Sequence, residues 1–298
     1  MKLLTLLFWS SFLCHSPQAL AAACCGGGFA APALIAGDDS AQITSSIGYT
    51  DVAVDNVDSQ GLWRAREEHQ KVQTLRLEAA TLIADRWQMG VAIPLIQRTY
   101  SGENSSGVGD VATTLGYEYL PDWDYNPYRP KGLGYAQITL PTGKSRAESE
   151  NGLDSRGQGF WAVGVGTLLT KAWHRWDAFV SLEGHRSFAK DFKNGNMDGT
   201  LKPGYGSTFG GGTGYNTAAW RFGGSLLWSY EDAVEISPAG WSQGSVERYA
   251  TATLAASYIP TDEWTGTLSY SDQTIFGEPV NTSLGRSVNL QLQRRWGR

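Results

Sequence analysis

The sequence predicts an all-β protein, an antiparallel transmembrane β-barrel of about twelve strands with long extracellular loops and short periplasmic turns. Three observations lead to this fold class. Apolar and polar residues alternate with a period of two along most of the chain, and helical periodicity is absent. Short and long connections alternate between the predicted strands. Tryptophan gathers at the strand ends, as in membrane barrels.

The composition excludes several other classes of protein. The chain has 298 residues, of which 41% are hydrophobic and 18% charged, and its formal net charge is −5. An acidic balance argues against nucleic acid as a partner, because a phosphate-binding surface needs clustered Lys and Arg. The mean hydropathy of −0.29 argues against a bundle of membrane helices. The 36 glycines and the many aromatic residues are typical of β architecture.

The N-terminus predicts export from the cytoplasm. Met1-Lys2 is followed by an apolar run over Leu3–Leu13 and by small residues at Ala21–Ala23, which is the order of a secretory signal peptide. The apolar run is too short to cross a bilayer, where about 20 residues are needed. We therefore expect residues 1–23 to be a signal peptide and the mature protein to reside in the bacterial outer membrane.

The segment that follows differs from the rest of the chain. Residues 24–40 are rich in glycine and begin Cys24-Cys25-Gly26, and residues 41–298 form the predicted barrel. The segment is expected to plug the periplasmic mouth of the barrel, or to anchor the chain through a lipid on Cys24.

Twelve segments read as strands. The clearest places Trp161, Val163 and Val165 on one face and Ala162 and Gly164 on the other. The weakest is 204–215, where repeated glycine indicates a bend or bulge as much as a strand. In order, the predicted strands lie near 41–51, 69–82, 86–99, 109–120, 132–142, 159–170, 174–187, 204–215, 218–230, 248–259, 263–272 and 286–297.

The connections between these segments alternate in length. Short ones are expected at Ala84-Asp85, Lys171–Trp173, Asn216-Thr217 and Pro260–Asp262, with Pro121–Lys131 a longer member of the same class. The others are long and polar, over roughly 52–68, 100–108, 143–158, 188–203, 231–247 and 273–285. With an even number of strands, this pattern puts both chain ends on the periplasmic side.

Tryptophan gives an independent indication of the membrane. Seven tryptophans lie at or beside a short turn or the C-terminus, namely Trp87, Trp123, Trp173, Trp176, Trp220, Trp264 and Trp296. Trp161 and Trp228 lie at the opposite ends of their strands. Aromatic girdles at both interfaces explain this distribution, whereas a soluble secreted β protein would scatter its tryptophans through a core.

If the large apolar faces meet lipid, the opposite faces line the lumen. An Arg on the lipid face costs about 2–4 kcal/mol at the bilayer midplane, so charged strand residues should point inward. Their signs are mixed, which favours ion pairs across the lumen over a ring of one charge. These residues either only keep the interior polar or guide a solute. The predicted lumen-lining residues are Arg76, Glu78, Asp110, Glu118, Asp177, Glu183, His185 and Arg221.

Two motifs resemble sites of other proteins. The run from Gly240 to Gly244 matches the Gly-x-Ser-x-Gly pattern of hydrolases around Ser242, but no helical stretch follows it. The run from Asn194 to Gly199 copies the first half of a calcium loop, but the twelfth position is Tyr205 where Glu is needed. We therefore expect no catalysis, no metal and no cofactor.

Two further segments carry a family resemblance. One is Gly107-Val108-Gly109-Asp110, which opens an alternating strand, and the other is Leu140-Pro141-Thr142-Gly143, which closes one. Together they make residues 100–185 similar to the outer-membrane transporters associated with meta-pathway phenol degradation. The resemblance implies a barrel that passes small, hydrophobic or aromatic compounds, and it carries over no site residues. The end of the chain departs from the usual assembly signal, because Gly297 and Arg298 follow the last aromatic residue.

The favoured function is therefore passive passage of small molecules through the outer membrane, without chemistry. The expected partners are outer-membrane lipid, a small-molecule solute and the barrel-assembly machinery. One alternative is an occluded barrel with a structural or adhesive role. A second alternative is an outer-membrane hydrolase that uses Ser242 or His185.

Overall fold

The computed structural model describes residues 32–65, 70–145, 148–149, 153–194, 197–237, 242–243 and 246–298. Within these residues the chain is all β. Its strands are β1 (Asp39–Val57), β2 (Trp63–Arg64), β3 (Lys71–Ala84), β4 (Trp87–Tyr100), β5 (Glu103–Val108), β6 (Val111–Leu120), β7 (Lys131–Leu140), β8 (Ala162–Trp173), β9 (Trp176–Ser187), β10 (Lys190–Asn194), β11 (Met197–Lys202), β12 (Tyr205–Asn216), β13 (Trp220–Glu231), β14 (Glu235–Ser237), β15 (Ser242–Gln243), β16 (Glu247–Tyr258), β17 (Trp264–Asp272) and β18 (Thr282–Gly297).

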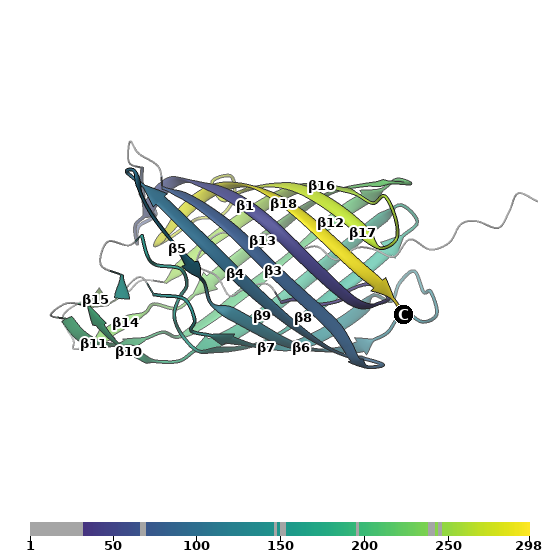
Figure 1. Ribbon diagram of the computed structural model, residues 1–298, viewed down its shortest axis with the longest axis horizontal. Coiled ribbons are helices and arrows are strands. Elements are labelled where there is room, and N and C mark those ends of the chain that lie inside the picture. The colour runs from purple at the N-terminus through teal and green to yellow at the C-terminus, as the bar shows by residue number, and fades with distance from the viewer. Residues whose placement is uncertain are drawn as a thin grey trace, which may run out of the picture.

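Twelve long strands form a closed antiparallel barrel. They pair in the order β1-β3-β4-β6-β7-β8-β9-β12-β13-β16-β17-β18, and β18 returns to pair with β1. This closing pair runs from Asp39↔Gly297 to Val57↔Thr282. Figure 1 shows the strands crossing the barrel diagonally, with the C-terminus at one end and β10, β11, β14 and β15 beyond the other. The predicted fold class is confirmed, with twelve strands in the barrel.

The two faces of the wall are inverted relative to a soluble protein. Alternation puts Ile47, Val180 and Leu290 on the outside, where each is more than half exposed. Their strand neighbours on the inner face, such as Asp177 and Asn289, are buried. An apolar outside around a polar interior is the arrangement of a membrane barrel. No helix in the described part of the chain is long and apolar enough to cross a membrane.

One predicted turn is wrong by two residues. The segment Lys171–Trp173 was expected to connect two strands, but it forms the end of β8. The reversal lies at the next two residues, where His174 adopts a φ of 51°. Trp173 and Trp176 then form the last pair of the hairpin. The strand periodicity continues through Lys171 because this lysine has a partner outside the strand, Asp122.

Several predicted long loops contain further strands. At 100–108 the chain reverses at Ser101 and Gly102, both with positive φ, and β5 then pairs back onto β4. The loops around 188–203 and 231–247 contribute β10, β11, β14 and β15 to a separate four-stranded sheet. In this sheet β11 pairs with β14 of the other loop, and local alternation does not reveal that pairing.

The glycine-rich segment near 204–215 is a regular strand. β12 pairs along its whole length with β9 and with β13, with no shift of register on either side. The bend or bulge that its composition also suggested is absent from this strand. Its glycines have a different role, which is to make room inside the barrel.

Candidate functional site in the barrel interior

The interior is lined by polar side chains from most strands. Alternation turns every second residue inward, and on β18 this face carries Ser287, Asn289, Gln291, Gln293 and Arg295, all buried. Glutamine amides and threonine hydroxyl groups continue the polar lining on β1 and β7. Buried polar groups need partners, so the contacts among them decide how much of the interior is fixed.

Asp177 and Arg221 form a fork-like ion pair. The Arg221 Nε and Nη2 atoms donate to the two carboxylate oxygens of Asp177 at 2.8 and 2.6 Å. Asn216 Nδ2 donates to the same carboxylate at 2.7 Å. The pair joins β9 to β13 across the intervening strand β12, and a Cβ at Gly214 would lie 2.4 Å from the Arg221 Nη2 atom. Because Gly214 has no side chain, the Arg221 guanidinium can pass over the inner face of β12 to reach Asp177.

His185 is held between two carboxylates, and a glycine of β12 again makes room for the side chain. Its Nδ1 atom lies 3.0 Å from Glu183 Oε1, and its Nε2 atom lies 3.1 Å from Glu231 Oε2. A Cβ at Gly206 of β12 would lie 2.4 Å from the imidazole. The imidazole is buried and joins β9 to β13. Both of its ring nitrogens face carboxylates, which is an arrangement for a structural link.

The remaining predicted lumen residues form smaller contacts. On β3, Arg76 Nε donates to Glu78 Oε1 at 2.7 Å, and both side chains are mostly buried. Glu118 on β6 is buried and lies 3.7 Å from the Lys131 ammonium. These contacts put opposite charges next to each other on the inner face, so the charges are largely neutralised locally.

Asp110 binds the loop between β7 and β8. It lies in the break between β5 and β6, and its carboxylate accepts hydrogen bonds from the backbone N–H groups of Gly143 at 2.8 Å and Gly159 at 3.0 Å. The Thr142 hydroxyl donates to Gly109 O at 2.6 Å and accepts from Val111 N at 3.0 Å. The two glycine-based motifs of the sequence therefore contact each other where β6 begins and β7 ends.

A further ion pair joins two parts of this loop. Lys144 binds Asp154, which also accepts from the Ser149 hydroxyl. The Lys144 ammonium and the Ser149 hydroxyl lower the pKa of the Asp154 carboxyl. The Asp154 carboxylate is therefore charged at neutral pH, and the loop is held both by Asp110 at the start of β6 and by this internal pair.

The described start of the chain, residues 33–36 of the N-terminal segment, lies inside the barrel. Ala33, Leu34, Ile35 and Ala36 are all buried, although they belong to no strand. The amide of Gln88 binds the backbone of Ile35 twice, accepting from its N–H at 2.6 Å and donating to its carbonyl at 3.1 Å. A Cβ at Gly90 would lie 2.1 Å from the Ala33 carbonyl oxygen. The segment therefore rests directly on the inner wall of β4.

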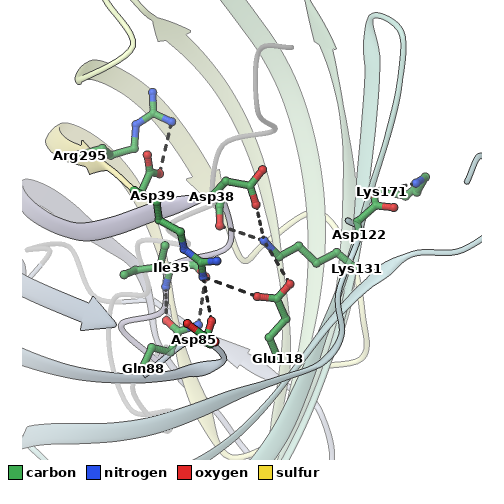
Figure 2. A network of polar contacts seen from close by, with 12 residues as sticks. Ile35, Asp38, Asp39, Asp85, Gln88, Glu118, Asp122, Lys131, Lys171 and Arg295 are labelled. Atoms are coloured by element: carbon green, nitrogen blue, oxygen red, sulfur yellow. Dashed lines mark hydrogen bonds and ion pairs between the residues drawn. The ribbon is translucent and has the colours of Figure 1, made fainter. Parts of the chain in front are cut away.

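Charged groups tie the end of this segment to β6 and β7. Lys131 Nζ donates to the Gly37 carbonyl at 2.9 Å and binds Asp38 Oδ1 at 3.0 Å. Figure 2 shows Lys131 pointing between Asp38 and Glu118, with Gln88 and Ile35 beside them. Across the closing strand pair, Arg295 Nη1 lies 3.8 Å from Asp39 Oδ2. This network gathers charges from residues 38–39, from β6, β7 and β18 at the end of the barrel where the short turns lie.

Sequence reasoning missed Lys131, Gln88 and Gln42 in this network. Alternation places the two glutamines on inward faces, but it does not show that they bind the N-terminal segment. Gln42 Nε2 donates to the Leu34 carbonyl at 2.9 Å. Lys131 stands at the boundary of a turn and a strand, where alternation gives no direction. No local signal could have identified its partners, because Gly37 is 94 positions away.

The catalytic and calcium look-alikes gain no support from the described residues. Gly240, Trp241 and Gly244 lie outside them, as do Gly195 and Asn196 of the calcium-like run. Among the described residues there is no group of three or more His, Cys, Asp or Glu side chains that could hold a metal ion. Cys24, at the predicted lipidation site, also lies outside the described residues.

Comparison of the fold with solved structures finds outer-membrane barrels. The crystal structure of the COG4313 outer membrane channel from Pseudomonas putida F1 superposes with a TM-score of 0.69 at 15% sequence identity, over 87% of this chain and 96% of that one. The fold is that of an outer-membrane β-barrel. At this identity the match is evidence for the fold alone.

Two further barrels among the matches have TM-scores below 0.5. The NanC porin has a TM-score of 0.47 at 12% identity, over 85% of this chain and 98% of its own. A monoaromatic hydrocarbon channel, TodX, has 0.46 at 10% identity, over 87% and 90%. No family model matches this sequence. No curated protein matches it either.

Proposed function

We propose that the protein is a passive channel of the bacterial outer membrane for small, hydrophobic or aromatic compounds, and that residues 24–40 close its periplasmic end. The observation that carries the proposal is the buried segment Ala33–Ala36 inside the barrel. An interior that accommodates an extended peptide is wide enough for a small solute once the peptide leaves. The segment is held by side chains and not by strand pairing, so it can leave without opening the barrel.

The inner face also carries apolar side chains. Leu133, Tyr135 and Phe179 are buried among the polar residues of β7 and β9. Arg76 and Glu78 face the same interior as a neutral pair. A lumen with few uncompensated charges and several aromatic or aliphatic side chains suits a neutral or weakly polar molecule better than an ion.

The proposal includes the route by which the chain reaches the membrane. Residues 1–23 are removed as a signal peptide, and the barrel-assembly machinery inserts the mature chain into outer-membrane lipid. Arg76, Glu78, Asp110, Glu118, Asp177, Glu183, His185 and Arg221 then serve as the lumen-lining set, of which Asp177, Arg221 and His185 keep the wall in shape.

Single-channel conductance in planar bilayers tests the proposal. The mature chain is compared with a truncated chain that begins at Asp39, both refolded and checked for heat-modifiable migration on a gel. We expect brief or rare openings from the mature chain and long-lived steps from the truncated chain. Swelling of liposomes in small aromatic solutes should be faster with the truncated chain as well.

The same experiment discriminates the alternative of an occluded structural barrel. That alternative is favoured by the buried pair Asp177–Arg221 and by the His185 link, which fill part of the interior. A folded truncated chain that neither conducts nor admits solutes would refute the channel and leave the structural role.

A further inference from the structure

One wall of the barrel interior carries hydrogen-bonding groups but no charge. It is formed by β17, β18 and β1, which lie side by side where the barrel closes (Figure 1). Between Gln42 and Thr50 on β1 and between Ser287 and Gln293 on β18, the inward positions hold only Ser, Thr, Asn, Gln and Gly. From Thr265 to Ser271 on β17 they hold only Ser and Thr. The ion pairs described above on β3, β6, β7, β9 and β13 lie outside this wall.

Several polar side chains of this wall bind one another or a neighbouring strand. Gln293 Nε2 donates to Gln42 Oε1 at 3.3 Å, which joins β18 to β1. The Thr267 hydroxyl on β17 lies 2.9 Å from the Ser257 hydroxyl on β16. Such pairs satisfy their members within the protein, as buried polar groups require.

Four side chains in the middle of the wall differ from these. Asn289 and Gln291 on β18 are only 4% and 5% exposed, yet no hydrogen bond joins either amide to another described residue. The same holds for the hydroxyl groups of Ser269, which is 7% exposed, and Ser46. In register, Ser269 of β17 lies opposite Asn289, and Ser46 of β1 lies opposite Gln291. On its other side Asn289 faces Gly48, which has no side chain to bind the amide.

The chemistry of these four groups selects a class of ligand. Every amide and every hydroxyl can both donate and accept a hydrogen bond. A hydrocarbon seated on them would leave them unpaired, and an ion would find no opposite charge. Neighbouring strands are about 5 Å apart, and successive inward residues on one strand are about 7 Å apart. The four groups are therefore spread over an area that suits a six-membered ring bearing several hydroxyl groups.

We propose that Ser46, Ser269, Asn289 and Gln291 form a subsite in the lumen for uncharged polyhydroxyl compounds, namely polyols and monosaccharides. The inference rests on the proposed channel, because the solute must enter the lumen, and it extends the channel beyond apolar compounds. β7 and β8 lie on the opposite side of the closed barrel, where Leu133 pairs with Leu168. A solute in the lumen therefore meets hydrogen-bonding groups on one side and apolar side chains on the other.

Binding of D-glucose to the folded mature protein tests the subsite. D-glucuronate is the matched probe, because it has the same ring and carries a carboxylate in place of one hydroxymethyl group. Saturation-transfer NMR titrations give both dissociation constants in a detergent without a sugar headgroup. We expect glucose to bind at least about fivefold more tightly than glucuronate, since the subsite offers no cation to a desolvated carboxylate.

Substitutions on one strand separate the subsite from the rest of the wall. Gln291→Met removes a free amide with little change of volume, and Ser269→Ala removes only a hydroxyl group. A hydrogen bond between uncharged groups changes affinity by a factor of about 2–10, so each variant should bind glucose more weakly by such a factor. Gln293→Met is the matched control, because Gln293 is 4% exposed on the same inward face but its amide is bound to Gln42 and Thr44. It should leave the dissociation constant unchanged.

Each outcome decides the proposal once heat-modifiable migration has shown that the variants are folded. Ser269→Ala carries the test if Gln291→Met does not fold. Glucose that fails to bind, or that binds the subsite variants as tightly as the wild type, would overturn the subsite. An equal loss in Gln291→Met and Gln293→Met would also refute it, because any inner amide would then matter. Glucuronate that binds as tightly as glucose would overturn the uncharged class of ligand. Binding needs no passage through the barrel, so a failure of the conductance experiment is distinguishable from a failure of the subsite.

Discussion

Substitution of Lys131 by methionine should release the N-terminal segment from the periplasmic end of the barrel. Methionine keeps most of the volume of lysine but removes its hydrogen bonds to the Gly37 carbonyl and to Asp38. The Gly37 bond is charge-assisted and partly buried, and such bonds contribute about 1.5–3 kcal/mol. The Asp38 side chain is 84% exposed, so its pair adds only about 0–1 kcal/mol.

The segment should therefore lose about 2 kcal/mol of attachment, which corresponds to a shift of roughly 30-fold in the ratio of seated to released segment. In single-channel recordings at neutral pH, the ratio of open to closed time should rise by a similar factor. Glu118 loses its neighbour at 3.7 Å, so the variant must first be shown to fold.

Lys171→Met is the matched control for this experiment. Lys171 lies on the adjacent strand β8 but binds Asp122 on the outer wall and not the segment. Its substitution should leave the open time unchanged. If Lys131→Met leaves the open time at the wild-type value, or if both variants raise it equally, the segment is not held by Lys131 and the reasoning is refuted.

Two further predictions concern the wall itself. Gly214→Ala should destabilise the barrel by about 1–3 kcal/mol in urea unfolding from micelles, because the added Cβ collides with the Arg221 guanidinium. Gly266→Ala, where a Cβ meets nothing within 4 Å, should change stability by less than about 0.5 kcal/mol, and equal effects at both sites would contradict the explanation. Asp110→Ala should raise amide hydrogen exchange at Gly143 at least tenfold, since the N–H loses its acceptor. Unchanged exchange at Gly143 would show that Asp110 does not hold the loop between β7 and β8.

Alternation predicted the barrel because its cause is local. In each strand the side chains point alternately to lipid and to the interior, so Val180 and Leu182 on the outside and Asp177 and Glu183 on the inside are visible in the sequence itself. The same logic gave twelve strands, with boundaries within a few residues for most of them. It failed at Lys171–Trp173, where the contact with Asp122 extends the strand beyond the predicted turn.

Glycine shows where composition is ambiguous. In β12 repeated glycine is equally compatible with a bulge and with a regular strand, because both need a residue without a side chain. The structure resolves this through contacts from the two neighbouring strands. Arg221 passes over Gly214 and His185 lies over Gly206, so the glycines make room for links between β9 and β13.

The sequence by itself determined the fold class and which faces of the strands are apolar. These follow from the cost of placing charges and unpaired strands in a bilayer, which acts on every strand separately. Only the tertiary structure decided which charges meet, how Asp110 clasps Gly143, and that Lys131 holds a segment 94 positions before it in the chain. Such contacts depend on barrel closure, which brings residues 33–39, the middle strands and β18 to one place.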